Sequence, residues 1–369
     1  MPTDDESSGL DWGYEEGSVE MTLGDRLRER YRDHIYEPGV VALDDWRFVV
    51  GGLIVLVYFV VGIVGPFLVS DPVGSQYANP TFFSPIKWVS VLTIGGLDIA
   101  YPTFRDLAMP LGTNTYGQSI FGLIIHATPK MLVMLLTGGV FATIMATLLG
   151  TVSGYKGGAW DSAITMFNDV AMTIPGLPLV IVIGLAARPY LETLRDLPEP
   201  LNLLSPAVIG MIIMINYWGG LSRAIRSQVL TLRDAEYAEA SRTMGVGAPS
   251  IILKDVLPNL MPYILVNFVN AARFVIFSAV GLYYLGVLPA NQANWGMMIN
   301  NAQNQGALIG GLGQWYRVLP PVMAVLGIAL GLILFSQGMD RLFNPRVRTK
   351  LASFDESDDD DSVEDVMNE

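Results

Sequence analysis

The sequence has no cysteine and only two histidines, His34 and His126. Without cysteine the chain has no disulfides, thiolate zinc sites, iron–sulfur clusters or cysteine nucleophiles. Two histidines cannot form a multi-histidine metal site, and no His-Glu-x-x-His string occurs. The sequence also lacks the Gly-x-x-x-x-Gly-Lys-Ser/Thr string that cradles ATP phosphates and the Gly-x-Ser-x-Gly elbow of hydrolases. We therefore expect a non-catalytic chain with no metal site and no cofactor of its own.

Charged residues are scarce and unevenly distributed. Only 15% of the residues are charged and 51% are hydrophobic, whereas soluble domains have roughly 25% charged residues. The net charge of −13 comes from the two ends, because residues 1–20 hold seven acids, residues 351–369 hold nine, and neither segment has Lys or Arg. We expect both ends to be solvated, disordered tails. The acidic balance argues against nucleic-acid binding, which requires a surplus of Lys and Arg.

The basic residues are 17 Arg and only 5 Lys. Together with the acidic tails, this bias resembles proteins of high-salt organisms, such as a halophilic archaeon. Tails that are merely disordered are the alternative explanation.

Six gaps between charged residues are long and apolar enough to cross a bilayer. A helix rises 1.5 Å per residue, so about 20 apolar residues cross the hydrocarbon layer. The predicted spans are 48–70, 131–155, 170–187, 200–222, 256–288 and 318–339. The segment before the last span is rich in Asn and Gln, and we expect it to form a polar outer loop that includes Trp295. The predicted fold class is an all-α polytopic membrane protein with six transmembrane helices in contact with membrane lipid.

The distribution of Lys and Arg predicts the orientation, because basic loops remain cytoplasmic. With both termini inside, 15 Lys and Arg lie on the cytoplasmic side and six on the outer side. We therefore expect cytoplasmic termini and a multi-pass protein of the cell (plasma) membrane. The first span follows a long acidic segment, which predicts an anchor and not a cleavable signal peptide.

The longest cytoplasmic connection, residues 223–258, contains two predicted helices. Residues 234–244 are rich in Ala and in charge, which is typical of a surface helix, and Gly245 ends that helix. Pro249 suits the first turn of a second helix, which we expect to run until Pro258 interrupts it. The connection is therefore a helix, a glycine turn and a second helix beneath the membrane.

Within this connection, Glu239-Ala240-Ser241 is followed by Gly245 and later by Leu257-Pro258. This order resembles the Glu-Ala-Ala…Gly…Leu-Pro loop of binding-protein-dependent ABC importer permeases. In that family the first helix docks in a cleft of the ATPase subunit and transmits its closure to the membrane helices. The resemblance implies that the ATPase-coupling residues are Glu236, Glu239, Ala240, Ser241, Arg242, Gly245, Leu257 and Pro258.

Other motifs between residues 46 and 346 resemble the second, C-type permease of the dipeptide/oligopeptide/nickel branch. They lie at 111–117, 154–161, 169–175, 295–300 and 319–346. Three features depart from the branch pattern, one of which is the loss of an acid from the stretch at 278–286. Asn114 and Gln118-Ser119 replace Asp and Arg-Asp, and residues 188–202 look like an added outer loop.

The resemblance implies a set of partners. They are a homologous second permease subunit, two ABC ATPase subunits that bind ATP and Mg, and an extracellular solute-binding protein that delivers a peptide substrate. ATP-driven closure of the ATPases would turn the pathway from inward-facing to outward-facing.

Polar side chains within the predicted spans are candidates for the translocation path. Tyr263, Asn267, Asn270 and Arg273 are spaced by four, three and three positions, which places them on one face of a helix. A charge near mid-bilayer is costly unless it faces water or a partner, so Arg273 is either a pathway residue that attracts a carboxylate or part of an ion pair with another helix. Asp169 either lines the same path or supports polar packing.

The sequence thus divides into a cytoplasmic tail (1–45), a first span (46–70), an extracellular loop (71–129), a permease core of five spans (130–346) and a C-terminal tail (347–369). We expect the chain to form half of a peptide pathway, coupled to ATPases through residues 236–258. A nickel or other small polar solute is the alternative within the class. A self-sufficient secondary transporter or channel is the alternative outside it, although we find no clear inverted repeats or membrane carboxylates.

Overall fold

The computed structural model describes residues 43–342, except 44, 73, 74, 76, 78, 82, 95, 96, 290–292, 308 and 310–313. Nearly all of the two predicted tails, and the end of the last branch motif at 343–346, lie outside the described residues. The described elements are α3 (Trp46–Leu68), β1 (Ile86–Ile94), β2 (Leu97–Phe104), α4 (Ile120–Lys156), α5 (Gly158–Thr173), α6 (Gly176–Arg195), η2 (Leu201–Leu203), α7 (Leu204–Ile213), α8 (Trp218–Arg233), α9 (Glu236–Thr243), α10 (Ala248–Ile251), η3 (Ile252–Val256), α11 (Leu257–Tyr284), α12 (Trp295–Asn304) and α13 (Trp315–Leu342).

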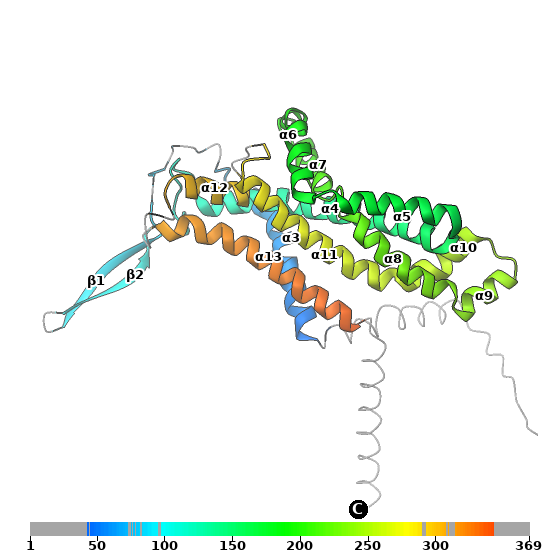
Figure 1. The fold of residues 1–369 in the computed structure, drawn as a ribbon. Helices are drawn as coiled ribbons and strands as arrows, with labels where there is room; N and C mark the ends of the chain where they lie inside the picture. The colour runs from blue at the N-terminus through cyan, green and yellow to red at the C-terminus, as the bar shows by residue number, and fades with distance from the viewer. Residues whose placement is uncertain are drawn as a thin grey trace, which may run out of the picture.

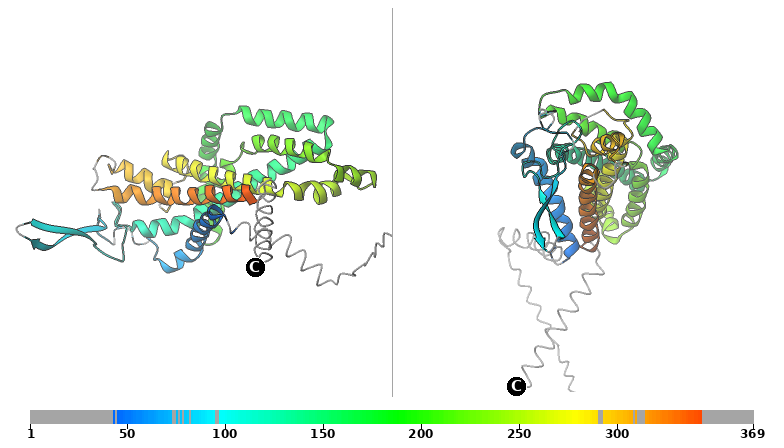
Figure 2. Two further views of the ribbon diagram at one scale, coloured as in Figure 1. Left: turned by 90° about the horizontal axis from the view of Figure 1, so that it is seen from below. Right: turned by 90° about the vertical axis from the view of Figure 1, so that its left-hand side faces the viewer.

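The helices form an elongated bundle (Figure 1). The β1–β2 hairpin projects from one end and α9 lies at the other, and the left-hand view in Figure 2 shows the same arrangement. Five helical segments are long and apolar enough to cross a membrane, and a sixth span results if α7 and α8 count as one bent span. The chain is therefore a multi-pass membrane protein, as its apolar runs predict.

The predicted third span, 170–187, is displaced in the structure. The helix breaks at Ile174 and Pro175, whose backbones are extended or non-helical, so that α5 ends at Thr173 and α6 begins at Gly176. Because α6 continues to Arg195, the expected outer loop at 188–202 is wrong for its first half. Charge spacing located the apolar residues but not the chain break.

The predicted fourth span, 200–222, is bent by 64° between α7 and α8. Residues 214–217 form turns at this bend. Tyr217 and the buried Trp218 (5% exposed) lie where α8 begins, and Trp218 Nε1 donates to the Ile215 carbonyl oxygen at 2.6 Å. The indole therefore packs inside the bundle.

The predicted extracellular loop, 71–129, holds two kinds of regular structure. Strands β1 and β2 pair antiparallel, with a register irregularity between Ser90 and Leu92. The last ten residues of the expected loop, 120–129, belong to α4, whose N-cap Ser119 accepts a hydrogen bond from the Gly122 backbone N–H. The all-α prediction therefore holds for the bundle, and the hairpin is an addition to it.

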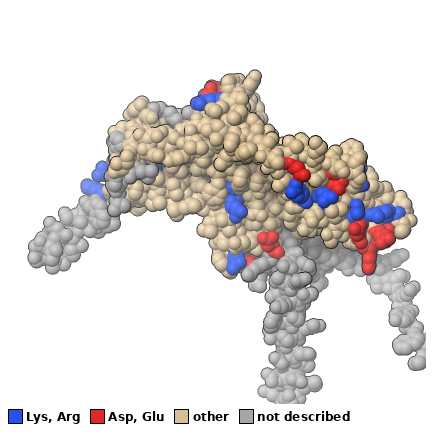
Figure 3. All heavy atoms as spheres, viewed as in Figure 1, with Lys and Arg blue, Asp and Glu red and all other residues tan. Residues whose placement is uncertain are grey.

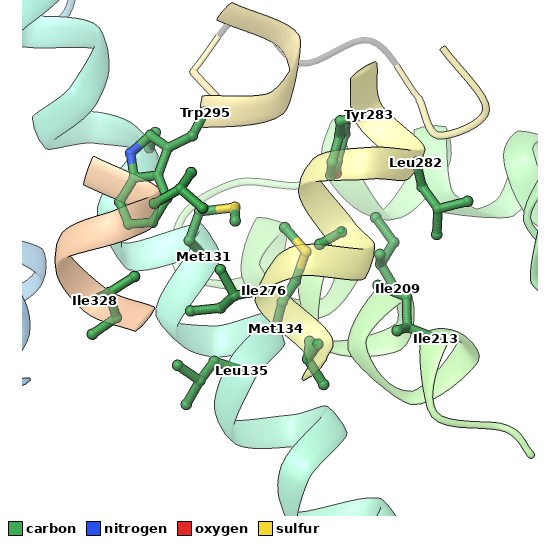
Figure 4. Packing of buried hydrophobic residues seen from close by; sticks show 14 of the residues in the cluster. Met131, Met134, Leu135, Ile209, Ile213, Ile276, Leu282, Tyr283, Trp295 and Ile328 are labelled. Atoms are coloured by element: carbon green, nitrogen blue, oxygen red, sulfur yellow. The ribbon is translucent and has the colours of Figure 1, made fainter. Parts of the chain in front are cut away.

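The main hydrophobic core lies where α4, α7, α11, α12 and α13 meet. Figure 4 shows Met131 and Met134 of α4 facing Ile276 of α11, with Trp295 of α12 above them. Trp295 is fully buried (0% exposed) and begins a helix, so the expected polar outer loop is wrong here. Asn294 caps that helix by accepting a hydrogen bond from the Gly296 backbone N–H at 2.9 Å.

Small residues allow a close contact between α4 and α7 in this core. A Cβ at Gly210 of α7 would lie 2.4 Å from the Met134 carbonyl oxygen, and one at Gly138 of α4 would lie 2.6 Å from the Gly210 carbonyl oxygen. Helices in lipid associate through such close van der Waals packing, because lipid tails are as apolar as the side chains. Because lipid tails are apolar, the large exposed apolar residues on α3, such as Leu53 and Ile63, suit a helix that faces lipid.

Candidate functional site

Helix α9 ends in a glycine turn with a complete hydrogen-bond pattern. Gly245 has φ +78°, a left-handed conformation that glycine adopts without strain. Its N–H donates to the Arg242 carbonyl oxygen at 3.0 Å, and the Val246 N–H donates to the Ser241 carbonyl oxygen at 3.1 Å. These two bonds form a Schellman motif. The predicted helix and its glycine stop are confirmed.

The second helix of the connection does not stop at Pro258. A π turn, η3, joins α10 to α11, and the Leu257 N–H donates to the Ile252 carbonyl oxygen. Pro258 then occupies the first turn of α11, where its missing N–H is tolerated. Residues Ala248–Tyr284 consequently run as one helical segment of 37 residues. The expected interruption is wrong, and the connection leads without a break into a membrane helix.

Two side-chain hydrogen bonds attach α9 to its neighbours. Ser241 Oγ donates to Asp255 Oδ2 of η3 at 3.0 Å, and the Arg242 guanidinium donates to the Arg233 carbonyl oxygen of α8 at 3.3 Å. Ala238 on the inner face of α9 is fully buried. We call residues 236–258 the coupling segment; the first bond joins its two ends, α9 and η3, and the second ties α9 to α8.

A second hydrophobic cluster supports the base of the coupling segment. Ile251 and Val256 are buried with Ile225 and Val229 of α8 and Leu260 of α11. Four of these five side chains are β-branched, and such side chains have restricted rotamers. The coupling segment is therefore packed tightly against α8 and α11.

The outer surface of the coupling segment is exposed and mixed in character. The carboxylates of Glu236 and Glu239 are exposed, and neither forms an ion pair with a described residue. Met244 is 74% exposed and Leu253 is 63% exposed. Figure 3 shows Lys, Arg, Asp and Glu gathered at this end of the molecule, while much of the remaining visible face is neutral. Exposed apolar side chains, Met among them, with polar residues around them are typical of a surface that contacts another protein.

The candidate translocation residues lie on α11 as predicted, and all four are half-buried. Asn267 Nδ2 donates to the Tyr263 carbonyl oxygen at 2.8 Å, one turn earlier. Arg273 forms no ion pair with any described residue, and the adjacent Phe274 packs against Tyr217 with the rings tilted and their centroids 4.9 Å apart. Within the described part of this chain, the ion-pair alternative for Arg273 thus has no acid to support it.

Asp169 lies on α5 and pairs with Arg223 of α8. Both side chains are about half exposed (51% and 52%). The structure therefore places Asp169 at the contact of α5 with α8 and does not bring it together with the four residues on α11.

A stronger pair that sequence reasoning did not single out lies nearby. Arg226 of α8 donates two hydrogen bonds to Asp161 of α5, and Ser153 Oγ and Thr165 Oγ1 donate to the same carboxylate. The bonds from Arg226 and Ser153 hold the pKa of the Asp161 carboxyl well below its ordinary value of 3.8. No local pattern could reveal this pair, because its members are 65 positions apart.

Histidine and carboxylate side chains, which could bind a metal, do not cluster in the described residues. Among the described residues, no group of three or more His, Asp or Glu could hold a metal ion. His126 Nε2 lies 2.9 Å from the Val69 carbonyl oxygen, so this imidazole is packed between α4 and the end of α3.

Comparison with known proteins identifies the family. Residues 146–349, more than half of the chain, match the family described as binding-protein-dependent transport system inner membrane component. The chain belongs to this family of transport permeases. The matched region begins within α4 and includes the whole coupling segment, α11 and α13.

Several named permeases are similar to the chain. The dipeptide transport system permease protein DppC of Bacillus subtilis (strain 168) is 25% identical over 332 residues, which cover 87% of this permease and 91% of the relative. The probable D,D-dipeptide transport system permease protein DdpC of Escherichia coli (strain K12) is 27% identical, over 73% of this permease and 83% of the relative. The oligopeptide transport system permease protein OppC of Lactococcus lactis subsp. cremoris (strain SK11) is 25% identical, over 65% and 76%.

Proposed function

We propose that this permease forms half of the membrane pathway of an ATP-driven peptide importer. The observation that carries the proposal is the coupling segment, which exposes Glu236 and Glu239 at one end of the bundle and continues without a break into α11. The named relatives are dipeptide and oligopeptide permeases, and they support a peptide as the substrate.

The proposed complex contains three kinds of partner protein. A second, homologous permease completes the pathway, and two ATPase subunits bind ATP and Mg and receive α9 of each permease. An extracellular solute-binding protein delivers the peptide. The excess of Lys and Arg on the α9 side of the predicted spans supports a cytoplasmic location for this end and for both termini.

The proposed mechanism is mechanical and involves no chemistry on the substrate. Closure of the ATPases displaces α9, and the Ser241–Asp255 bond and the buried Ile251 and Val256 pass this movement to α11. Because Tyr263, Asn267, Asn270 and Arg273 lie on α11, the same movement changes the side chains that line the proposed pathway. The Arg273 guanidinium attracts the peptide carboxylate there.

Uptake by the reconstituted complex tests the substrate and the energy source together. Proteoliposomes that hold both permeases, the ATPases and the binding protein should accumulate labelled dipeptide only with ATP. Accumulation of nickel and not of dipeptide would show that nickel is the substrate. Uptake by the permeases without ATPases would indicate a secondary transporter or channel.

Replacement of Glu239 tests the docking surface. Glu239→Gln should lower ATP-driven uptake about tenfold, which corresponds to about 1.4 kcal/mol of lost interaction, while the ATPases continue to hydrolyse ATP. Glu192→Gln is the matched control, because Glu192 is also partly exposed but pairs with Arg188 on α6. Normal coupling in Glu239→Gln would contradict the docking role.

A further inference from the structure

The β1–β2 hairpin has no role in the proposed mechanism. Its strands pair antiparallel, from Ile86 with Phe104 to Ile94 with Leu97. Strand β1 has nine residues, so at 3.3 Å per residue the hairpin is about 30 Å long. In Figure 1 and in the left-hand view of Figure 2, it extends beyond the ends of α12 and α13 and away from the bundle. The hairpin therefore reaches past the membrane helices.

Both outer edges of the hairpin are open in the described part of the chain. The sheet has only these two strands there, and no described helix packs along either of them. A two-stranded hairpin is at best marginally stable alone in water. An open edge also presents unpaired backbone N–H and C=O groups, to which a strand of another protein can add. The hairpin is thus typical of an element that another protein completes.

The hairpin has little charge for a segment that leaves the bundle. Lys87 and Asp98 are the only charged residues in the two strands. At the base, Phe104 is 63% exposed and Leu107 is 83% exposed. Lipid does not account for this surface, because no described helix of span length lies between α3 and α4. An exposed apolar surface outside the membrane indicates contact with another protein.

The size of the hairpin distinguishes two kinds of partner. Its two faces, each 30 by 10 Å, offer about 600 Å² on this chain. Permanent assemblies bury about 2,000–5,000 Å² in total, whereas weak and transient complexes bury less than about 1,200 Å². A second permease needs a permanent contact. A solute-binding protein that docks and leaves in each cycle needs a transient one, and the hairpin has the size for it.

We propose that the outer hairpin, defined as β1, β2 and Leu107, docks the extracellular solute-binding protein. The partner that fits presents an apolar surface with an exposed strand, because the hairpin offers open edges and few charges. This inference rests on the proposed function, which places the coupling segment inside the cell and the opposite end of the bundle outside.

Binding to the complete complex in nanodiscs tests the inference. The probe is the purified solute-binding protein, loaded with labelled dipeptide. Replacing residues 89–101 with Asn-Gly shortens the hairpin and supplies a two-residue turn. The affinity for the binding protein should fall about tenfold or more. ATP-driven uptake should fall at limiting binding protein and recover at a saturating concentration, because only docking is weakened.

A second variant leaves the strands at full length. Phe104→Ser combined with Leu107→Ser should also weaken docking about tenfold, since aromatic and apolar anchors contribute most to such contacts. Leu201→Ser is the matched control, because Leu201 is 53% exposed and lies in η2, outside the hairpin. It should bind as the parent complex does. An unchanged affinity in the shortened or the doubly substituted complex would overturn the inference.

Hydrogen exchange in the parent complex gives a test that does not depend on any variant folding. The binding protein should slow exchange at the backbone amides of β1 and β2, and no slowing would overturn the inference. Failure of the shortened chain to join the second permease would overturn it too, because the hairpin would then contact that subunit. A parent complex that takes up no dipeptide with ATP would instead contradict the proposed function. Normal uptake by the parent with unchanged docking in the variants would contradict the docking hairpin alone.

Discussion

Asp161 of α5 and Arg226 of α8 form a two-pronged ion pair. Arg226 Nε donates to Asp161 Oδ1 and its terminal NH2 nitrogen donates to Asp161 Oδ2, both at 2.6 Å. Ser153 of α4 donates to the same carboxylate, so one aspartate joins three helices. Because α8 leads directly to α9, this junction also holds the helix that carries the coupling segment.

Loss of this junction should destabilise the bundle measurably. Asp161→Asn removes the charge from a carboxylate that is only 23% exposed, and we expect a loss of about 1–3 kcal/mol. Asp169→Asn is the matched control on the same helix, because its pair with Arg223 is half exposed and should contribute less than about 1 kcal/mol. Thermal unfolding in detergent compares the two. Equal midpoints for both variants would contradict the role given to Asp161.

The same pair should make stability depend on acid pH. The folded state lowers the pKa of Asp161 below its ordinary 3.8, so the ionised pair stabilises the fold fully above that value and is lost as the pH falls through the folded pKa. The difference in unfolding midpoint between the parent chain and Asp161→Asn should be constant from about pH 7 to 5 and shrink below about pH 4. If the difference between the two unfolding midpoints grew as the pH fell, the predicted role of the ionised Asp161 would be contradicted.

The glycine turn after α9 offers a test of local geometry. A side chain at Gly245 meets no atom within 4 Å, so Gly245→Ala costs only the strain of φ +78°, about 1–2 kcal/mol. We expect faster hydrogen exchange at the backbone amides of residues 245 and 246, because the Schellman bonds weaken. Gly281→Ala is the control, since Gly281 is also open and lies within a helix. Exchange in Gly245→Ala that matches the parent chain would show that the turn tolerates a side chain.

The closest contact of α4 with α7 predicts a larger effect. Gly210→Ala brings a methyl group to 2.4 Å from the Met134 carbonyl oxygen, and backbone cannot yield as a flexible side chain can. We expect a loss of about 1–3 kcal/mol or a failure to fold. Gly52→Ala meets only the Phe335 ring at 3.6 Å, an ordinary contact, and should be tolerated. Folded yield and unfolding midpoint in detergent compare the two, and equal values would argue against close packing at Gly210.

Much of the candidate site could be predicted from sequence, because its signals are local. The helix over α9 and its stop at Gly245 depend on neighbouring residues, and both are confirmed. The stop expected at Pro258 is wrong, because a π turn places that proline where a helix accepts it. The alignment of four polar residues on α11 follows from helical periodicity alone. Whether they face a translocation path stays a prediction.

The sequence by itself determined which segments are apolar enough for a membrane, because span length and charge spacing are properties of the chain alone. Only the tertiary structure decided that α7 and α8 meet at 64°, that Trp295 is in the core, and that Arg226 pairs with Asp161. Each of these depends on side chains far apart in the chain. Their contacts form only when helices pack, and no local pattern records which helices those are.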